Sequence, residues 1–447
     1  MRASPFISRP RIGKRGYRLK LTHTFWASLG LLCSGLAHAN VLNIAPDSVD
    51  AQAWIIYDPQ TQQTLASHQA DTRRAPASLT KMMVAYIALK EVQQGRLALE
   101  QLVTVSPVVQ QVQADESKMR LQVGTEVSID TLLAGLTVMS ANDAALLLAE
   151  KISGSVPAFV ARMNQEAQAL AMHNTHFQNP PGITMPQHYS TAADLAKLSE
   201  AVIQQTPYYL HYSSLPDFHY QQIQHPATNL LLARDASVDG LKTGFTQAAG
   251  YNLALSARRP NTDLYSPERR LIVVVLGTPS IAKRAEVAHQ LLNVAYTYTQ
   301  NTSVLQPGQA IAQIPVQKSR YTWFNVHVKN PIVVSTSLYT ATMPLNLKQF
   351  DRQKQRAYQL VGQQKQWIEP LTQPIELKIN LKQHLLAAPL QQEMTLAEVE
   401  IYQQQQLLRR APIVNHVQLE EQTLFHQGLQ WLHDVYHGIQ REAKVSL

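Results

Sequence analysis

Apolar segments of β type stand at both ends of a long helical region, and this arrangement constrains the fold more than any other feature of the chain. Residues 53–57 and 64–66 flank a turn that contains Pro59, a pattern typical of a β-hairpin. Residues 251–256 and 271–276 also favour strands. Helical patterns occupy 78–94, 128–139, 142–153, 157–171 and 191–205, with a further helix at 279–298. We therefore expect an α+β domain whose single sheet is assembled from distant pieces of chain.

The pattern changes in the last third of the chain. Short alternating runs at 323–328 and 331–335 lie between polar, glutamine-rich stretches. These runs predict a small all-β domain over residues 301–414, which follows the α+β domain expected over residues 40–300. No motif with recognisable chemistry falls in the β-rich part.

The first 39 residues carry seven lysines and arginines and no acid, followed by an apolar run at 25–36 and the sequence Ala-His-Ala at 37–39. This order is typical of a signal peptide that is cleaved after Ala39. The apolar run is too short to predict a membrane span. Without residues 1–39 the formal net charge of +8 falls by seven to +1, so the composition does not support a nucleic-acid partner.

The only cysteine, Cys33, lies inside this signal segment. The chain expected after cleavage therefore has no thiol, which excludes disulfide bonds, a cysteine nucleophile and thiolate metal ligands. We expect an exported protein that works outside the cytoplasm, with no cofactor.

Three short motifs occur in order along the α+β region: 78–81 (SLTK), 140–142 (SAN) and 242–244 (KTG). The set S-x-x-K, S-x-N and K-T-G is found in serine β-lactamases and penicillin-binding proteins. A second S-x-x-K, at 280–283, is not followed by the other two motifs, each of which occurs once. Their order therefore selects Ser78 as the candidate nucleophile.

The chemistry of the first motif depends on the three-residue spacing between Ser78 and Lys81. Pro76 favours the start of a helix, which would place Ser78 in the first turn near free backbone N–H groups. Lys81 can then reach the Ser78 hydroxyl from the same helix face. A serine hydroxyl needs a base, and lysine serves as one only if burial and nearby cations lower its pKa. We expect the other two motifs to supply that environment.

Five segments carry a closer resemblance to one family. They are 74–83 (RAPASLTKMM), 140–144 (SANDA), 174–177 (NTHF), 179–182 (NPPG) and 239–246 (DGLKTGFT). Together they resemble the low-molecular-mass penicillin-binding proteins, in particular the D-alanyl-D-alanine carboxypeptidases with a C-terminal membrane helix. The resemblance implies a transpeptidase- or β-lactamase-like domain with an antiparallel sheet and helices, then a small all-β domain and an amphipathic anchor. It also implies a serine hydrolase that trims peptidoglycan stem pentapeptides and binds β-lactam antibiotics covalently.

The resemblance assigns roles to the first two motifs. Ser78 would be the acylated nucleophile and Lys81 its general base. Ser140 would relay a proton to the leaving D-alanine, and Asn142 would contact an amide of the substrate.

The third motif and one later residue complete the implied site. Lys242 and Thr243 would meet the terminal carboxylate of the substrate, and Gly244 would let the edge strand approach the substrate without a Cβ in the way. The backbone N–H groups of the nucleophile and of Phe245 would form the oxyanion hole. Arg284 occupies the position of a carboxylate-binding arginine, and the alternative is an ordinary surface residue of the last helix.

Two features depart from the family pattern. Phe245 stands where some close relatives have histidine, a change that spares the backbone donor. The segment 259–268, between the two late strands, looks longer than usual and predicts either a solvated hairpin loop or one wall of the cleft.

Other functions share parts of this pattern. A class A β-lactamase needs a glutamate before K-T-G, and no E-x-x-L-N-like segment lies between Asn142 and Lys242. A D,D-endopeptidase would use the same site on a cross-linked peptide and stays open. A catalytically idle wall-binding protein would not need the full motif set. The H-E-x-x-H and G-x-S-x-G motifs of metallopeptidases and α/β-hydrolases are absent, and no metal site is expected.

Residues 418–447 predict an amphipathic helix, and 424–441 divide cleanly into an apolar and a polar side at 100° per residue. Aromatic residues on the apolar side favour a helix that lies in the membrane interface, and the alternative is a helix docked on the β-rich domain. His426, His433 and His437 share the polar side, and we interpret them as part of that solvated face rather than as a metal site. The expected location is therefore the periplasmic face of the bacterial inner membrane, as a peripheral protein.

Overall fold

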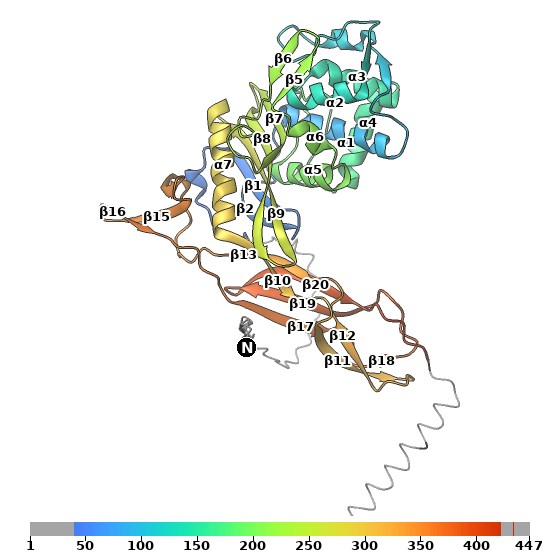
Figure 1. Cartoon of the computed structure of the whole chain (residues 1–447), viewed down its shortest axis with the longest axis vertical. Helices are drawn as coiled ribbons and strands as arrows, with labels where there is room; N and C mark the ends of the chain where they lie inside the picture. The colour runs from blue at the N-terminus through green and yellow to red at the C-terminus, as the bar shows by residue number, and fades with distance from the viewer. Residues whose placement is uncertain (1–39, 422–431, 433–447) are drawn as a thin grey trace, which may run out of the picture.

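The structure is a computed structural model that describes residues 40–421 and Leu432. Figure 1 shows an elongated arrangement with a helical layer at one end, a sheet beside it, and a β-rich domain at the other end. The predictions for the signal peptide at 1–39 and for the amphipathic helix at 424–441 lie outside the described residues, apart from Leu432.

An antiparallel sheet of five strands, in the order β2-β1-β9-β8-β7, forms the centre of the α+β part. The strands are β1 (Ala53–Asp58), β2 (Gln63–His68), β7 (Val238–Thr246), β8 (Gly250–Asp263) and β9 (Ser266–Thr278). The N-terminal hairpin and the two late strands meet in one sheet, which confirms the predicted α+β fold. The K-T-G motif lies on β7, the edge strand expected for it.

The apolar run of β9 is continuous because helices cover both faces of the sheet. Ile272, Val274 and Leu276 join the core beneath the helical layer. Leu271 and Val273 point to the opposite face, where α7 (Ile281–Tyr298) packs. Since successive side chains of a strand point to opposite faces, a strand between two helical layers is apolar at every position.

The helical layer contains the five helices expected from the sequence, with bounds close to the predicted ones. They are α1 (Lys81–Gln93), α2 (Ile129–Val138), α3 (Asn142–Ser153), α4 (Val156–Ala169) and α5 (Ala192–Gln205). A short helix that was not predicted, α6 (Tyr209–Ser213), follows them. Side-chain oxygens of Ser128, Ser155 and Thr191 accept the first free backbone N–H groups of α2, α4 and α5, which fixes where these helices begin. Two short antiparallel pairs, β3 (Leu102–Thr104) with β4 (Glu126–Ser128) and β5 (Asp217–Tyr220) with β6 (Ile223–Pro226), flank the layer.

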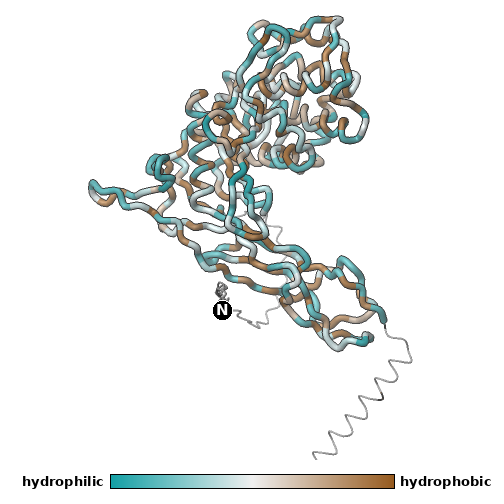
Figure 2. The backbone as a smooth tube through the Cα atoms, viewed as in Figure 1, coloured by the Kyte–Doolittle hydropathy of each residue, from teal (hydrophilic) through white to brown (hydrophobic). Residues whose placement is uncertain are grey.

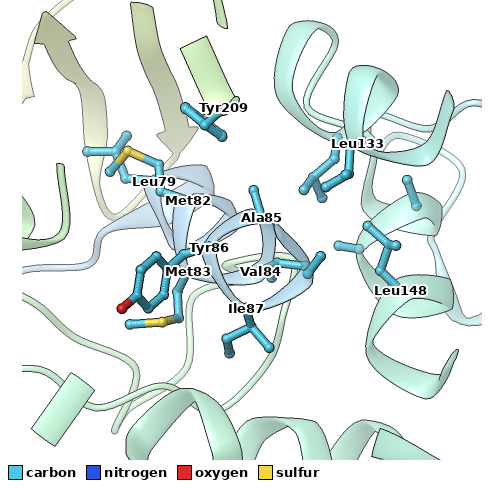
Figure 3. Close-up of a cluster of buried hydrophobic side chains, with 14 of the residues drawn as sticks. Leu79, Met82, Met83, Val84, Ala85, Tyr86, Ile87, Leu133, Leu148 and Tyr209 are labelled. Atoms are coloured by element: carbon cyan, nitrogen blue, oxygen red, sulfur yellow. The ribbon is translucent and has the colours of Figure 1, made fainter. Parts of the chain in front are cut away.

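Helix α1 runs through the middle of this layer and is buried on nearly all sides. Figure 3 shows Met82, Val84 and Ile87 pointing in different directions from the helix into apolar surroundings. A helix that is apolar around its whole circumference belongs in a core rather than on a surface. The residue that begins this helix, Lys81, is therefore held in a rigid and dry environment.

The β-rich domain begins at Thr299, next to the boundary expected at residue 301. Its strands are β10 (Thr299–Leu305), β11 (Ala310–Gln317), β12 (Trp323–His327), β13 (Ile332–Ser337), β14 (Phe350–Asp351), β15 (Arg356–Val361), β16 (Gln364–Trp367), β17 (Ile375–Leu381), β18 (Leu386–Ala387), β19 (Thr395–Gln403) and β20 (Gln406–Val414). They form the sheets β10-β13, β12-β11-β18, β17-β19-β20 and β14-β15-β16. Figure 2 shows apolar and polar residues interleaved along these strands, as expected for sheets with one face on a core.

Two segments cross between the parts in ways that the sequence pattern did not indicate. Ile44, near the start of the described chain, forms a β-bridge with Leu345 of the β-rich domain. The β14-β15-β16 hairpin lies beside α7 (Figure 1), where Tyr298 donates a hydrogen bond to the Ile368 carbonyl.

The segment 259–268 is a largely exposed hairpin, which confirms the first of the two interpretations. It continues β8 and β9 as a two-stranded ribbon away from the helical layer, toward the β-rich domain. There Asp263 accepts hydrogen bonds from the backbone N–H and the hydroxyl of Ser303 in β10, at 2.7 and 2.6 Å. The extra length therefore fastens the two domains together.

A buried network of polar groups completes this joint. Arg269 in β9 and Asp58 in β1 form an ion pair at 2.7 Å, and their side chains are 2% and 0% exposed. Asp58 also accepts a hydrogen bond from Ser335 of β13, and Arg269 donates to the carbonyl and hydroxyl of Thr299. Because charged groups are stable in a core only when they are paired and hydrogen-bonded, this network fixes how the sheet meets the β-rich domain.

Within residues 40–421, no single helix is long and apolar enough to cross a membrane, although α3 and α4 meet that criterion together as a pair bent by 86°.

Candidate active site

The candidate nucleophile Ser78 lies in a short 3₁₀ turn, Ala77–Thr80, directly before α1. The sequence placed it in the first turn of the α-helix itself, whereas the regular helix begins three residues later. Ala77 has a φ of +52°, in the left-handed region, so the backbone turns sharply beside the serine. Asn252 of β8 donates to the carbonyls of Ala75 and Pro76 at 3.1 and 3.2 Å and so holds the turn against the sheet.

The Lys81 amine lies 2.9 Å from the Ser78 hydroxyl oxygen and donates to the carbonyl of Pro181 at 2.6 Å. The lysine is 1% exposed. Burial lowers its pKa to about 7, although the charges of Glu116 and Asp143 act in the opposite direction. A substantial fraction of the amine is therefore neutral near pH 7, as a general base requires.

The second motif lies at the beginning of α3. Ser140 is buried and has a φ of +65°, a conformation that is uncommon outside glycine and is often found at functional sites. Asn142 donates its side-chain amide to Glu116 at 2.6 Å and its backbone N–H to the carbonyl of Ser117 at 2.8 Å. These contacts attach the preceding loop to the motif.

The third motif brings a second buried lysine to the site. Lys242 is 2% exposed, and its amine donates to the Thr243 carbonyl at 3.0 Å. Burial lowers its pKa well below the usual value, and the positive charges of Lys81 and Arg284 lower it further. The electrostatic coupling indicates that the three cations share one region.

Arg284 is a buried residue of this region, so the surface-arginine alternative is wrong. It is 6% exposed, and its guanidinium donates to the Thr228 carbonyl at 3.1 Å. Burial lowers its pKa to about 10. The hydroxyl of Thr243 donates to the hydroxyl of the same Thr228 at 2.6 Å, which links the arginine to the K-T-G strand.

Gly244 is needed first for the contact between β7 and the nucleophile turn. A Cβ at this position would lie 3.0 Å from the Ser78 backbone nitrogen and 2.9 Å from a Leu79 methyl. From the sequence we expected Gly244 to make room for the substrate. In the structure the atoms closest to a Cβ at this position belong to the enzyme's own turn at Pro76–Leu79. The next residue, Phe245, is 48% exposed and stacks on Tyr251 with ring centroids 4.3 Å apart.

Known proteins with the same sequence pattern identify the family of this chain. The model of the D-alanyl-D-alanine carboxypeptidase family, peptidase S11, matches residues 40–280. The chain belongs to this family. As a family member it is a serine peptidase of peptidoglycan metabolism, as the motifs predicted.

Similar proteins in this family come from several bacteria. The D-alanyl-D-alanine carboxypeptidase DacA of Haemophilus influenzae is 35% identical over 272 residues, which are 60% of this chain and 68% of the relative. The carboxypeptidase DacD of Salmonella typhimurium is 30% identical over 378 residues, 83% of this chain and 86% of the relative. Among solved structures, penicillin binding protein 5 from Haemophilus influenzae has a TM-score of 0.70 at 28% identity, covering 85% of this chain and all of the other. The matches to DacD of Salmonella typhimurium and to penicillin binding protein 5 also include the β-rich domain.

Several residues of this D-alanyl-D-alanine carboxypeptidase site were not singled out from the sequence. They are Glu116, Thr228, the Pro181 carbonyl, His188 and Asn252. His188 illustrates the reason: its ring accepts from the Gln178 N–H at 3.0 Å and pairs with the Thr80 hydroxyl at 2.9 Å. Burial lowers its pKa to about 4, so it is neutral at physiological pH. These residues reach the site through contacts with segments that are distant in the sequence. Among them, only Pro181 lies in a segment, 179–182 (NPPG), that the family resemblance had singled out.

Proposed function

We propose that this chain removes the terminal D-alanine of peptidoglycan stem pentapeptides through an acyl-enzyme on Ser78. The observation that carries the proposal is the position of the Lys81 amine, which is buried and lies 2.9 Å from the Ser78 hydroxyl. Its pKa of about 7 allows a substantial neutral fraction at physiological pH. A serine becomes a good nucleophile when a neighbouring base takes its proton. The pairing therefore supports Ser78 as nucleophile and Lys81 as general base.

The first half of the reaction forms an ester and releases D-alanine. Lys81 takes the Ser78 proton while the serine oxygen attacks the carbonyl carbon of the last peptide bond. The negative charge on the carbonyl oxygen is stabilised by the backbone N–H groups of Ser78 and Phe245. Ser140 then gives its proton to the leaving nitrogen and takes the proton held by Lys81, the C–N bond breaks, and D-alanine leaves. In the second half, Lys81 takes a proton from water while the water oxygen attacks the ester carbonyl. The bond to the Ser78 oxygen then breaks, this oxygen takes the proton back from Lys81, and the shortened peptide leaves with a new carboxyl group.

The cations around β7 provide the recognition of the terminal carboxylate. Lys242, Thr243 and Arg284 meet this group in the proposal, because a carboxylate restores favourable pairing to buried cations. Lys242 has a lowered pKa without substrate, and an incoming carboxylate favours its charged form. Asn142 holds the substrate amide on the other side of the nucleophile.

The test is incubation of the purified protein with a pentapeptide that ends in D-Ala-D-Ala, followed by mass spectrometry. We expect the loss of one alanine by the wild type and none above background by Ser78→Ala, which should also fail to label with a fluorescent penicillin. Fast multiple turnover of penicillin would favour the β-lactamase alternative. Cleavage of a cross-linked peptide without alanine release would favour the endopeptidase alternative.

We also propose that the enzyme is exported and attached to the periplasmic face of the inner membrane through residues 424–441. The supports are the cationic and apolar order of residues 1–39 and the amphipathic division of 424–441. In addition, residues 415–421 leave the β-rich domain at the end away from the helical layer (Figure 1). An anchor there would keep the active site clear of the lipid surface.

Truncation after Glu421, which keeps the buried Leu419 and its β-bridge to Leu390, is expected to release active enzyme into the soluble periplasmic fraction. Little positive charge accompanies the apolar side of 424–441, so attachment of the full chain should resist washing with salt. The measurement is the distribution of penicillin-labelled protein between membrane and soluble fractions, with activity on a soluble peptide as the control. Truncated protein that stays on the membrane would place the anchor elsewhere, and unfolded protein would indicate a helix docked on the β-rich domain.

A further inference from the structure

One carboxylate at the active site has no part in the reaction described above. Glu116 is half-buried in the loop before the second motif, and its Oε2 atom accepts the side-chain amide of Asn142 at 2.6 Å. The charge of Glu116 also acts on the Lys81 amine, so it lies within electrostatic reach of the nucleophile.

Glu116 differs from the other acid that acts on Lys81. Both oxygens of Asp143 are occupied, because they accept the backbone N–H groups of Met119 and Leu121 at 2.9 and 3.1 Å. Glu116 has its second oxygen, Oε1, without a hydrogen-bond partner among residues 40–421. An open carboxylate oxygen beside a substrate-binding asparagine can accept a hydrogen bond from a bound molecule.

The position of this oxygen relative to the cations decides which molecule it suits. Lys242 and Arg284 belong to the wall formed by β7 and α7, where the terminal carboxylate is proposed to bind. Glu116 belongs to the wall formed by the second motif and repels a carboxylate. The site is thus positive on the side of β7 and α7, proposed for the leaving D-alanine, and negative beside Asn142, which is proposed to bind the acyl half of the substrate.

We propose that Glu116 is a specificity-determining residue that binds a free ammonium group on the residue preceding D-Ala-D-Ala. The inference rests on the proposed carboxypeptidase function and names its substrate class: stem peptides whose third residue carries an uncapped side-chain amine. An ammonium group supplies the donors and the charge that Oε1 and the local field favour. Peptides whose amine has been consumed in a cross-link or acylated lose this contact.

The experiment compares two tripeptides, Nα-acetyl-L-Lys-D-Ala-D-Ala and its Nα,Nε-diacetyl form, in kcat/KM for D-alanine release. We expect the wild type to favour the free amine by roughly five- to tenfold, a preference that declines as salt is added. Glu116→Gln keeps an oxygen for Asn142 but removes the charge, and its preference should fall close to one. Glu116→Lys should reverse the preference, and Glu116→Asp should retain part of it. Asp115→Asn, at the exposed neighbouring residue, is the matched control and should behave as the wild type.

The outcomes separate this inference from the function on which it rests. If neither tripeptide loses alanine, the proposed function fails. If both are hydrolysed and the wild type shows no preference, or Glu116→Gln keeps the wild-type preference, the role of Glu116 is overturned. Equal loss of preference in Asp115→Asn and Glu116→Gln would also overturn it, because the effect would then reflect the net charge of the loop.

Discussion

Lys81→Ala is expected to slow acylation by penicillin and by peptide about 10²- to 10⁴-fold, the range typical of a lost general base. The Ser78 hydroxyl would then have no neighbouring acceptor for its proton. The measurement is the rate of covalent labelling with a fluorescent penicillin, followed by stopped flow. Lys90→Ala is the matched control, because Lys90 lies on the same helix and pairs with Glu166 at 2.7 Å on its outer side.

The wild-type enzyme should show the same base in its pH dependence. Because the pKa of Lys81 is lowered to about 7, the amine is protonated and inactive below that pH and neutral above it. Acylation should therefore fall about tenfold per pH unit below pH 7 and level off above it. An acylation rate that is flat between pH 5 and 8, or unchanged in Lys81→Ala, would remove Lys81 from this role.

Arg269→Ala is expected to lower the free energy of unfolding by about 3–5 kcal/mol, because it leaves Asp58 charged and buried without its partner. The loss also breaks the hydrogen bonds that reach Thr299 and Ser335 across the domain joint. Urea denaturation followed by circular dichroism measures the change.

A surface ion pair provides the control for this variant. Arg258 and Glu268 lie 3.0 Å apart on the same ribbon, with side chains 57% and 61% exposed. Arg258→Ala should therefore cost less than about 1 kcal/mol. Similar losses for Arg258→Ala and Arg269→Ala would show that the buried network contributes no more than a surface contact.

Local pattern was sufficient for most of the fold. The helices at 142–153 and 191–205 have strong periodicity and clear beginnings, and the structure places them close to those bounds. The strand at 271–276 is continuous in apolar residues because of its central place in the sheet. The three motifs also came from the sequence, since each places two chemical groups at a short and fixed spacing.

The remaining features depend on contacts between distant segments. The segment 179–182 was singled out by its resemblance to the family, but its sequence does not indicate that the Pro181 carbonyl accepts the amine of Lys81, one hundred positions earlier. Arg284 could be given two interpretations because helix position alone does not say what covers a side chain. The hairpin at 259–268 was expected, but its contact with Ser303 in another domain was not, for the same reason. Such contacts are decided by the packing of whole elements, which short patterns do not encode.

The strand order has a consequence for how the enzyme matures. β1 is made early, yet its neighbour β9 follows only after the helical layer and β7–β8 have been synthesised. Strands that are far apart in the sequence pair slowly, whereas helices, whose contacts are local, form fast. The turn that carries Ser78 is fastened by Asn252 of β8, and Gly244 of β7 packs against it. The turn around the reactive serine is therefore complete only after β7 and β8 have joined the sheet, so a chain that ends before these strands carries no working hydrolase.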